Sequence, residues 1–158
     1  MPKRAPLEIA ALLSDPLVSG GEPVARLNLK AAMARVRRQL QGIGRAARLR
    51  FVIANPEHLL NAVREFGPFD VLHFDGHGGK GELLLEDDIG EALPIDPGRL
   101  EAMFAPQGRP PAQVVFLSAC HSASVARVFA GLGVRHVVAI DSEAAVLDVA
   151  AQAFAAHF

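Results

Sequence analysis

Short apolar runs, each separated from the next by a helical or loop pattern, constrain the fold of this chain more than any other feature. The runs cover residues 7–13, 49–54, 69–74, 113–119 and 135–140. Strands with so few polar interruptions are typical of a parallel sheet that is buried on both faces. The pattern therefore predicts a doubly wound α/β fold, in which a mostly parallel sheet carries helices on both faces.

Helical patterns lie between these runs. Apolar residues recur every three or four positions over residues 29–43, which predicts an amphipathic helix. A second helix is expected to begin after Asn55, an N-cap residue followed by a proline at the first helical position. Further helices are predicted over residues 97–104, over residues 125–132 and from Asp148 to residue 158.

One stretch breaks the alternation of strands and helices. Residues 81–95 consist of two short apolar segments around an acidic, turn-like centre, which is too interrupted for a helix. We expect a small β-hairpin there, directly after the third strand of the sheet. Residues 20–23, Gly-Gly-Glu-Pro, are expected to form a loop after the first strand.

The composition limits the class of partner. The chain has 158 residues, of which 51% are hydrophobic, and this suits one domain with a buried core. Its net charge of -1 lacks the basic excess of proteins that bind nucleic acids or membranes. The apolar stretch near the N-terminus is too short for a signal peptide or a membrane span. We therefore expect a cytoplasmic protein without a nucleic-acid or membrane partner.

Two reactive side chains follow neighbouring strands of the predicted sheet. His77 comes shortly after the third strand and Cys120 after the fourth, 43 positions later. In open parallel sheets, ligands bind beyond the carboxyl ends of the strands, so both side chains are expected at the same rim. A thiol and an imidazole that face each other form a nucleophile and its base. We expect Cys120 to be the nucleophile and His77 to accept or position the thiol proton.

The residues around this pair suit the stabilisation of negative charge. Gly78 allows the backbone to turn tightly after the histidine and offers an unobstructed amide N–H. The Cys120 amide is the natural second donor, so the two amides are expected to form an oxyanion hole. The positive end of the helix expected to begin at residues 122–124 favours a thiolate. Since Cys120 is the single cysteine, an internal disulfide and a zinc site built from several cysteines are excluded.

Two motifs in the chain resemble those of the caspase-like cysteine peptidases, and in detail those of the bacterial CHAT branch. Residues 71–78, VLHFDGHG, resemble the histidine motif, and residues 115–122, VFLSACHS, resemble the cysteine motif of an apolar strand followed by Ser-Ala-Cys-x-Ser. Residues 81–96 resemble the family's hairpin, and residues 133–139 and 146–148 resemble the strand and helix start beyond the cysteine. The resemblance spans nearly the whole chain, and the two motifs occur in the family's order.

The resemblance implies an endopeptidase that needs no metal or other cofactor, acts on a protein or peptide, and forms an acyl-enzyme. It also implies a separate regulatory partner protein in a bacterial defence or signalling system. Ser118, Asp141 and Asp148 are the candidate substrate-binding residues, with Asp148 at the position of the pocket acid in relatives that cleave after basic residues. Asp148 is also a natural helix N-cap, and both roles could coexist. Because family members usually continue past Phe158, residues 1–158 are expected to lack the C-terminal part of the domain.

Other interpretations remain open. The chain could be a catalytically silent caspase-like domain that binds a partner, with Cys120 as a core residue and His77 as a loop residue. His73, Asp75 and His77 alternate along one strand and could bind a metal, although no fourth ligand is evident. A nucleotide-binding domain is disfavoured because no phosphate-loop lysine motif follows any strand.

Overall fold

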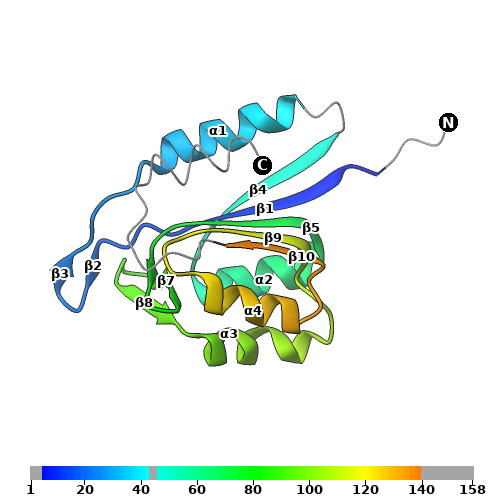
Figure 1. Cartoon of the computed structure of the whole chain (residues 1–158). Helices are drawn as coiled ribbons and strands as arrows, with labels where there is room; N and C mark the ends of the chain where they lie inside the picture. Colours follow the sequence, from blue (N-terminus) through cyan, green and yellow to red (C-terminus); the bar gives the residue numbers. More distant parts are fainter. Residues whose placement is uncertain (1–4, 43–45, 140–158) are drawn as a thin grey trace.

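Five parallel strands form the central sheet of the computed structural model, which describes residues 5–42 and 46–139 (Figure 1). They are β1 (Leu7–Leu13), β4 (Ala47–Ile53), β5 (Phe69–Asp75), β9 (Ala112–Ser118) and β10 (His136–Ala139). Their order across the sheet is β10-β9-β5-β1-β4, and all four pairings are parallel. The mostly parallel α/β sheet predicted from the apolar runs is confirmed, and the strand order reverses between β1 and β5.

Helices cover both faces of this sheet. The helix α1 (Leu29–Gln41) lies on one face, and α2 (Pro56–Phe66), α3 (Pro97–Phe104) and α4 (Ala123–Gly131) lie on the other (Figure 1). Successive side chains of a strand point to opposite faces. Leu72 and Phe74 of β5 therefore join the hydrophobic core beneath α2, α3 and α4, whereas His73, between them, faces α1.

Side-chain caps fix where α2 and α3 begin. At the start of α2, Asn55 Oδ1 accepts the amide N–H of Glu57 at 2.8 Å, and Pro56 occupies the first helical position. At the start of α3, Asp96 Oδ1 accepts the amide N–H of Arg99 at 2.8 Å. Both starts were predicted from the sequence. The helix predicted from Asp148 lies outside the described residues.

Short antiparallel strands flank the carboxyl edge of the sheet. Directly after β5, the strands β6 (Gly78–Gly79), β7 (Glu82–Glu86) and β8 (Ala92–Ile95) form a three-stranded sheet. The expected loop at residues 20–23 contains a turn between the paired strands β2 (Val18–Ser19) and β3 (Glu22–Pro23). Gly20 and Gly21 take φ angles of 59° and 85°, and two successive positive φ angles are what a two-residue hairpin turn requires. A short 3-10 helix, η1 (Ala105–Gln107), follows α3.

Within the described residues, none of the helices has both the length and the apolar character that a membrane span requires.

Candidate active site

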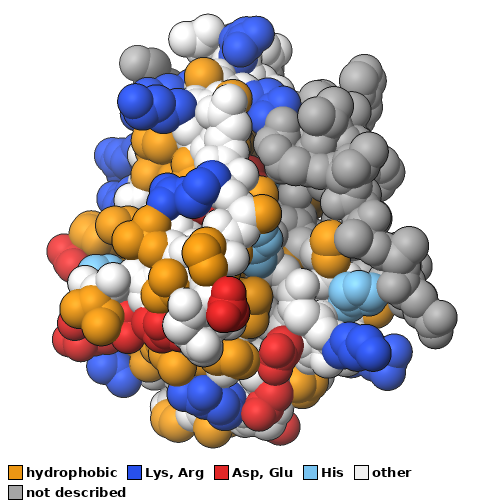
Figure 2. Space-filling model, turned by 90° about the vertical axis from the view of Figure 1, so that its left-hand side faces the viewer, with side chains coloured by type: hydrophobic (Ala, Val, Ile, Leu, Met, Phe, Trp, Pro, Cys, Tyr) orange, Lys and Arg blue, Asp and Glu red, His pale blue; other side chains and the backbone are white. Residues whose placement is uncertain are grey.

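His77 and Cys120 lie just beyond two directly paired strands. In the pairing of β5 with β9, Asp75 is opposite Ser118, and each candidate residue follows two positions later. The amide N–H of Gly76 donates to the Ser118 carbonyl at 3.3 Å, so the two segments remain hydrogen-bonded at the ends of their strands. The predicted arrangement of histidine and cysteine at one rim of the sheet is therefore present. Figure 2 shows this face, where histidine side chains reach the surface among hydrophobic and acidic side chains.

The loop that carries His77 packs directly on the backbone of Cys120. A Cβ atom added to Gly78 would overlap the carbonyl oxygen of Cys120 and would lie 3.2 Å from its amide nitrogen. No side chain fits between two main-chain segments that approach so closely. Glycine at position 78 is thus a requirement of this contact.

The amide N–H of Gly78 is directed away from its neighbouring strand. Gly78 is opposite Leu83 in the antiparallel pair of β6 and β7, and the Leu84 amide N–H donates to the His77 carbonyl at 3.0 Å. In an antiparallel ladder, hydrogen-bonded and non-hydrogen-bonded pairs alternate, so the pair of Gly78 and Leu83 exchanges no bonds. This orientation is compatible with the predicted role of Gly78 as an oxyanion donor.

The imidazole of His77 contacts a backbone carbonyl that the sequence analysis did not identify. Its Nε2 atom lies 2.8 Å from the carbonyl oxygen of Ala25. Because a carbonyl only accepts hydrogen bonds, Nε2 carries the hydrogen, and in the neutral ring the lone pair is then on Nδ1. The ring therefore presents a base on its other nitrogen. A carbonyl contact of this kind leaves no signature in the sequence, since every residue carries the same group.

The chain reverses sharply after Cys120. Cys120 is half-buried, and His121 has a φ angle of 54°, which is unusual for a residue other than glycine. The left-handed turn at His121 leads into α4, which begins at Ala123. The amino-terminal end of α4, which carries a positive partial charge, therefore begins three residues after Cys120.

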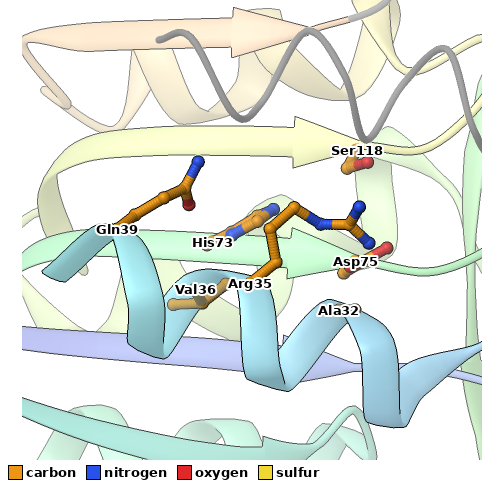
Figure 3. A pocket seen from close by; sticks show the side chains of 7 residues that line it. All are labelled: Ala32, Arg35, Val36, Gln39, His73, Asp75 and Ser118. Atoms are coloured by element: carbon orange, nitrogen blue, oxygen red, sulfur yellow. The ribbon is translucent and has the colours of Figure 1, made fainter. Parts of the chain in front are cut away.

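Ser118, a predicted substrate-binding residue, lines a small cavity between α1 and the sheet (Figure 3). The Ser118 side chain is buried, and the cavity has a volume of about 10 Å³, which is room for about one water molecule. Figure 3 shows the Arg35 side chain of α1 extending over β5 toward Asp75. In this structure the cavity has no room for a substrate side chain.

His73 faces the same cavity and is a structural residue. Burial, and secondly the positive charge of Arg35, lower the pKa of His73 from 6.5 to about 4. The neutral ring packs edge-on against Phe116, with centroids 5.1 Å apart. His73 Nε2 and Arg35 Nη2 are both buried without a hydrogen-bond partner. In the part of the chain that the structure describes, no three His, Cys, Asp or Glu side chains form a group suited to a metal ion.

Asp141 and Asp148, the other two candidate substrate-binding residues, lie outside the described residues. Their roles stay predictions.

Comparison with known families agrees with the sequence motifs. A family model described as the CHAT domain matches residues 5–158, and the match includes both strand ends that carry His77 and Cys120. A comparison with curated proteins found no match.

Proposed function

We propose that this chain, which belongs to the CHAT domain family and is thereby related to the caspase-like cysteine peptidases, is a cysteine endopeptidase. One observation carries the proposal: the paired ends of β5 and β9 deliver His77 and Cys120 to one rim, with the Gly78 backbone packed against Cys120. Two elements far apart in sequence thus carry His77, Gly78 and Cys120 to the same end of the sheet.

The proposed reaction uses this chain's own groups throughout. His77 Nδ1 takes the proton of the Cys120 thiol, and the thiolate attacks the scissile carbonyl carbon. The amide N–H groups of Gly78 and Cys120 stabilise the oxyanion of the tetrahedral intermediate. His77 then gives its proton to the leaving amine as the peptide bond breaks, which leaves a thioester on Cys120. Water, deprotonated by His77, hydrolyses the thioester and restores the thiol.

The single cysteine makes a direct test possible. Peptide acyloxymethyl ketones label a cysteine whose thiolate is activated within a peptide site, and mass spectrometry locates the adduct. We expect labelling on Cys120 in the wild-type chain, none in Cys120→Ala, and a strong loss in His77→Ala. Iodoacetamide, which needs only an accessible thiol, is the control and should still modify Cys120 in His77→Ala.

The competing function is a catalytically silent domain that binds a partner. It predicts that folded wild-type protein reacts with iodoacetamide but with none of a series of peptide ketones, with or without the partner. Equal ketone labelling of wild type and His77→Ala would also contradict the peptidase proposal, because the thiol would then react without its base.

For the substrate, we propose a protein or peptide that is cleaved after Arg or Lys in a bacterial defence or signalling system, with a separate protein as regulator. The support is the position of Asp148 in the family motif, since a basic side chain in a pocket needs a carboxylate partner. A positional-scanning peptide library should show a preference for Arg or Lys that weakens in Asp148→Asn more than in Asp141→Asn. A preference for Asp before the cleaved bond would remove Asp148 from the site.

A further inference from the structure

The carbonyl that contacts His77 belongs to an exposed segment. Residues 24–28 connect β3 to α1 without regular secondary structure, and Ala25 itself is exposed. Exposed loops with few buried contacts are the most mobile parts of a fold. A carbonyl in such a segment can hold an imidazole in one orientation only if the segment is anchored.

Asp15 provides that anchor. Its Oδ1 atom accepts the amide N–H of Leu27 at 3.0 Å, and its Oδ2 atom lies 2.7 Å from Arg26 Nη2. On the other side of Ala25, the Val24 amide N–H donates to the Leu17 carbonyl at 3.0 Å. The residues before and after Ala25 are therefore both tied to the segment that follows β1.

The anchor itself is fixed in the fold. Asp15 lies two residues after the buried end of β1, at the point where the strand order reverses, and its side chain is 4% exposed. Its own amide N–H is 3.5 Å from Glu86 Oε1 on β7. The side chain of Arg26 is 61% exposed, so this ion pair is weak. The bond from the Leu27 amide to the buried carboxylate is the stronger constraint.

We propose that Asp15 is a positioning residue that orients His77 through the carbonyl of Ala25. The chain of contacts runs from the Asp15 carboxylate to the backbone at Leu27, to the Ala25 carbonyl, and to His77 Nε2. Its consequence is that Nε2 keeps the hydrogen and Nδ1 stays available toward the thiol. The inference rests on the proposed function for its catalytic meaning, but the contacts can be tested without it.

The first test measures the tautomer of the His77 imidazole directly. The ¹⁵N chemical shifts of His77, at a pH where the ring is neutral, should report a hydrogen on Nε2 in the wild-type chain. Asp15→Ala should yield a mixture of tautomers, and Asp15→Asn, which can still accept the Leu27 amide, should stay closer to wild type. The matched control is Glu91→Gln, because the Glu91 carboxylate accepts the Gly20 amide N–H at 2.7 Å in the neighbouring β2–β3 turn.

The second test measures the kinetics of the proposed peptide cleavage. Asp15→Ala should lower kcat by about 10- to 100-fold, because a misplaced catalytic group is costly, while KM changes by less than about two-fold, because substrate contacts remain. Glu91→Gln should retain kcat. Should Asp15→Ala not fold, Asp15→Asn and Arg26→Gln take its place, with smaller losses of kcat and a smaller shift of the tautomer.

The outcomes separate the two proposals. A wild-type chain that never reacts with peptide ketones contradicts the proposed function, while the His77 shifts still decide whether Asp15 orients the ring. An unchanged tautomer and an unchanged kcat in folded Asp15→Ala would overturn the positioning role and leave the peptidase proposal intact.

Discussion

Gly78 is the residue at which the two candidate catalytic segments touch. In Gly78→Ala, the new methyl group would overlap the Cys120 carbonyl oxygen, so one of the two backbones must move. We expect this variant to lose peptide-ketone labelling, because the His77 loop and the thiol separate, and to be less stable by about 1–3 kcal/mol. Labelling kinetics and thermal unfolding measure the two effects.

Gly131→Ala is the matched control for this variant. Gly131 is the last residue of α4, and nothing within 4 Å would meet a Cβ atom added there. Since alanine favours a helix over glycine by up to about 1 kcal/mol, this change should leave labelling intact and not lower stability. A Gly78→Ala protein that is labelled at the wild-type rate would contradict the contact described above.

At the residue scale, the sequence showed the side chains that carry chemistry and missed the groups that hold them. His77, Cys120 and Gly78 stand in motifs, and the structure brings all three together. Ala25 contributes a main-chain carbonyl, and Asp15 acts on a main-chain amide far from the motifs. Neither role depends on a local pattern, because both follow from how the segment before α1 folds back onto the strand ends.

At the scale of elements, capping residues made the helix starts predictable. Asn55 and Asp96 each accept amide N–H groups within the first turn of their own helix, so the information is local. The two-residue strands β2, β3 and β6 were not predicted, because strands this short are defined by their pairing partners rather than by a period of alternating residues.

The helix α1 shows a second limit of local patterns. Its apolar spacing predicted one buried stripe, but Ala32 is the single buried residue along this helix, and Met33 and Val36 are half-buried. Polar side chains, among them His73 and Ser118, lie on the face of the sheet beneath α1. Arg35, whose charge alone would predict a position at the surface, extends into the cavity beneath α1 (Figure 3).

At the scale of the whole molecule, the two faces of the sheet differ in character. The face beneath α2, α3 and α4 holds the hydrophobic core, with Phe74, Leu117 and Phe129 among its members. On the other face, buried polar side chains such as His73 lie beside buried apolar ones such as Phe116. The apolar runs predicted a sheet with both faces covered, but they did not predict this difference, because it depends on which strands are neighbours and where α1 lies.

The buried His73 makes the stability of the whole molecule depend on pH. In the unfolded chain this ring takes up a proton near its ordinary pKa of 6.5, whereas burial and Arg35 lower the pKa to about 4 in the folded protein. Between these values the unfolded state binds more protons, so the free energy of unfolding falls as the pH falls. The neutral His73 ring makes its full contribution to the free energy of unfolding above pH 6.5. The shift corresponds to about 3 kcal/mol, lost as the pH decreases to 4.

Chemical denaturation of wild type and His73→Phe at pH 7 and pH 4.5 tests this prediction. Phenylalanine keeps an aromatic ring against Phe116 but does not titrate, so the loss of stability on acidification should be smaller by about 2–3 kcal/mol in the variant.

The raised pKa of Glu86, which is caused mainly by burial, has the opposite effect on stability, because a carboxyl that protonates more readily in the folded state favours folding at lower pH. Glu86 is common to both proteins, so its effect cancels in the difference. His58→Gln, at an exposed position of α2, is the control and should follow the wild-type pH dependence. If His73→Phe loses as much stability as wild type between the two pH values, His73 is not the group whose protonation destabilises the fold.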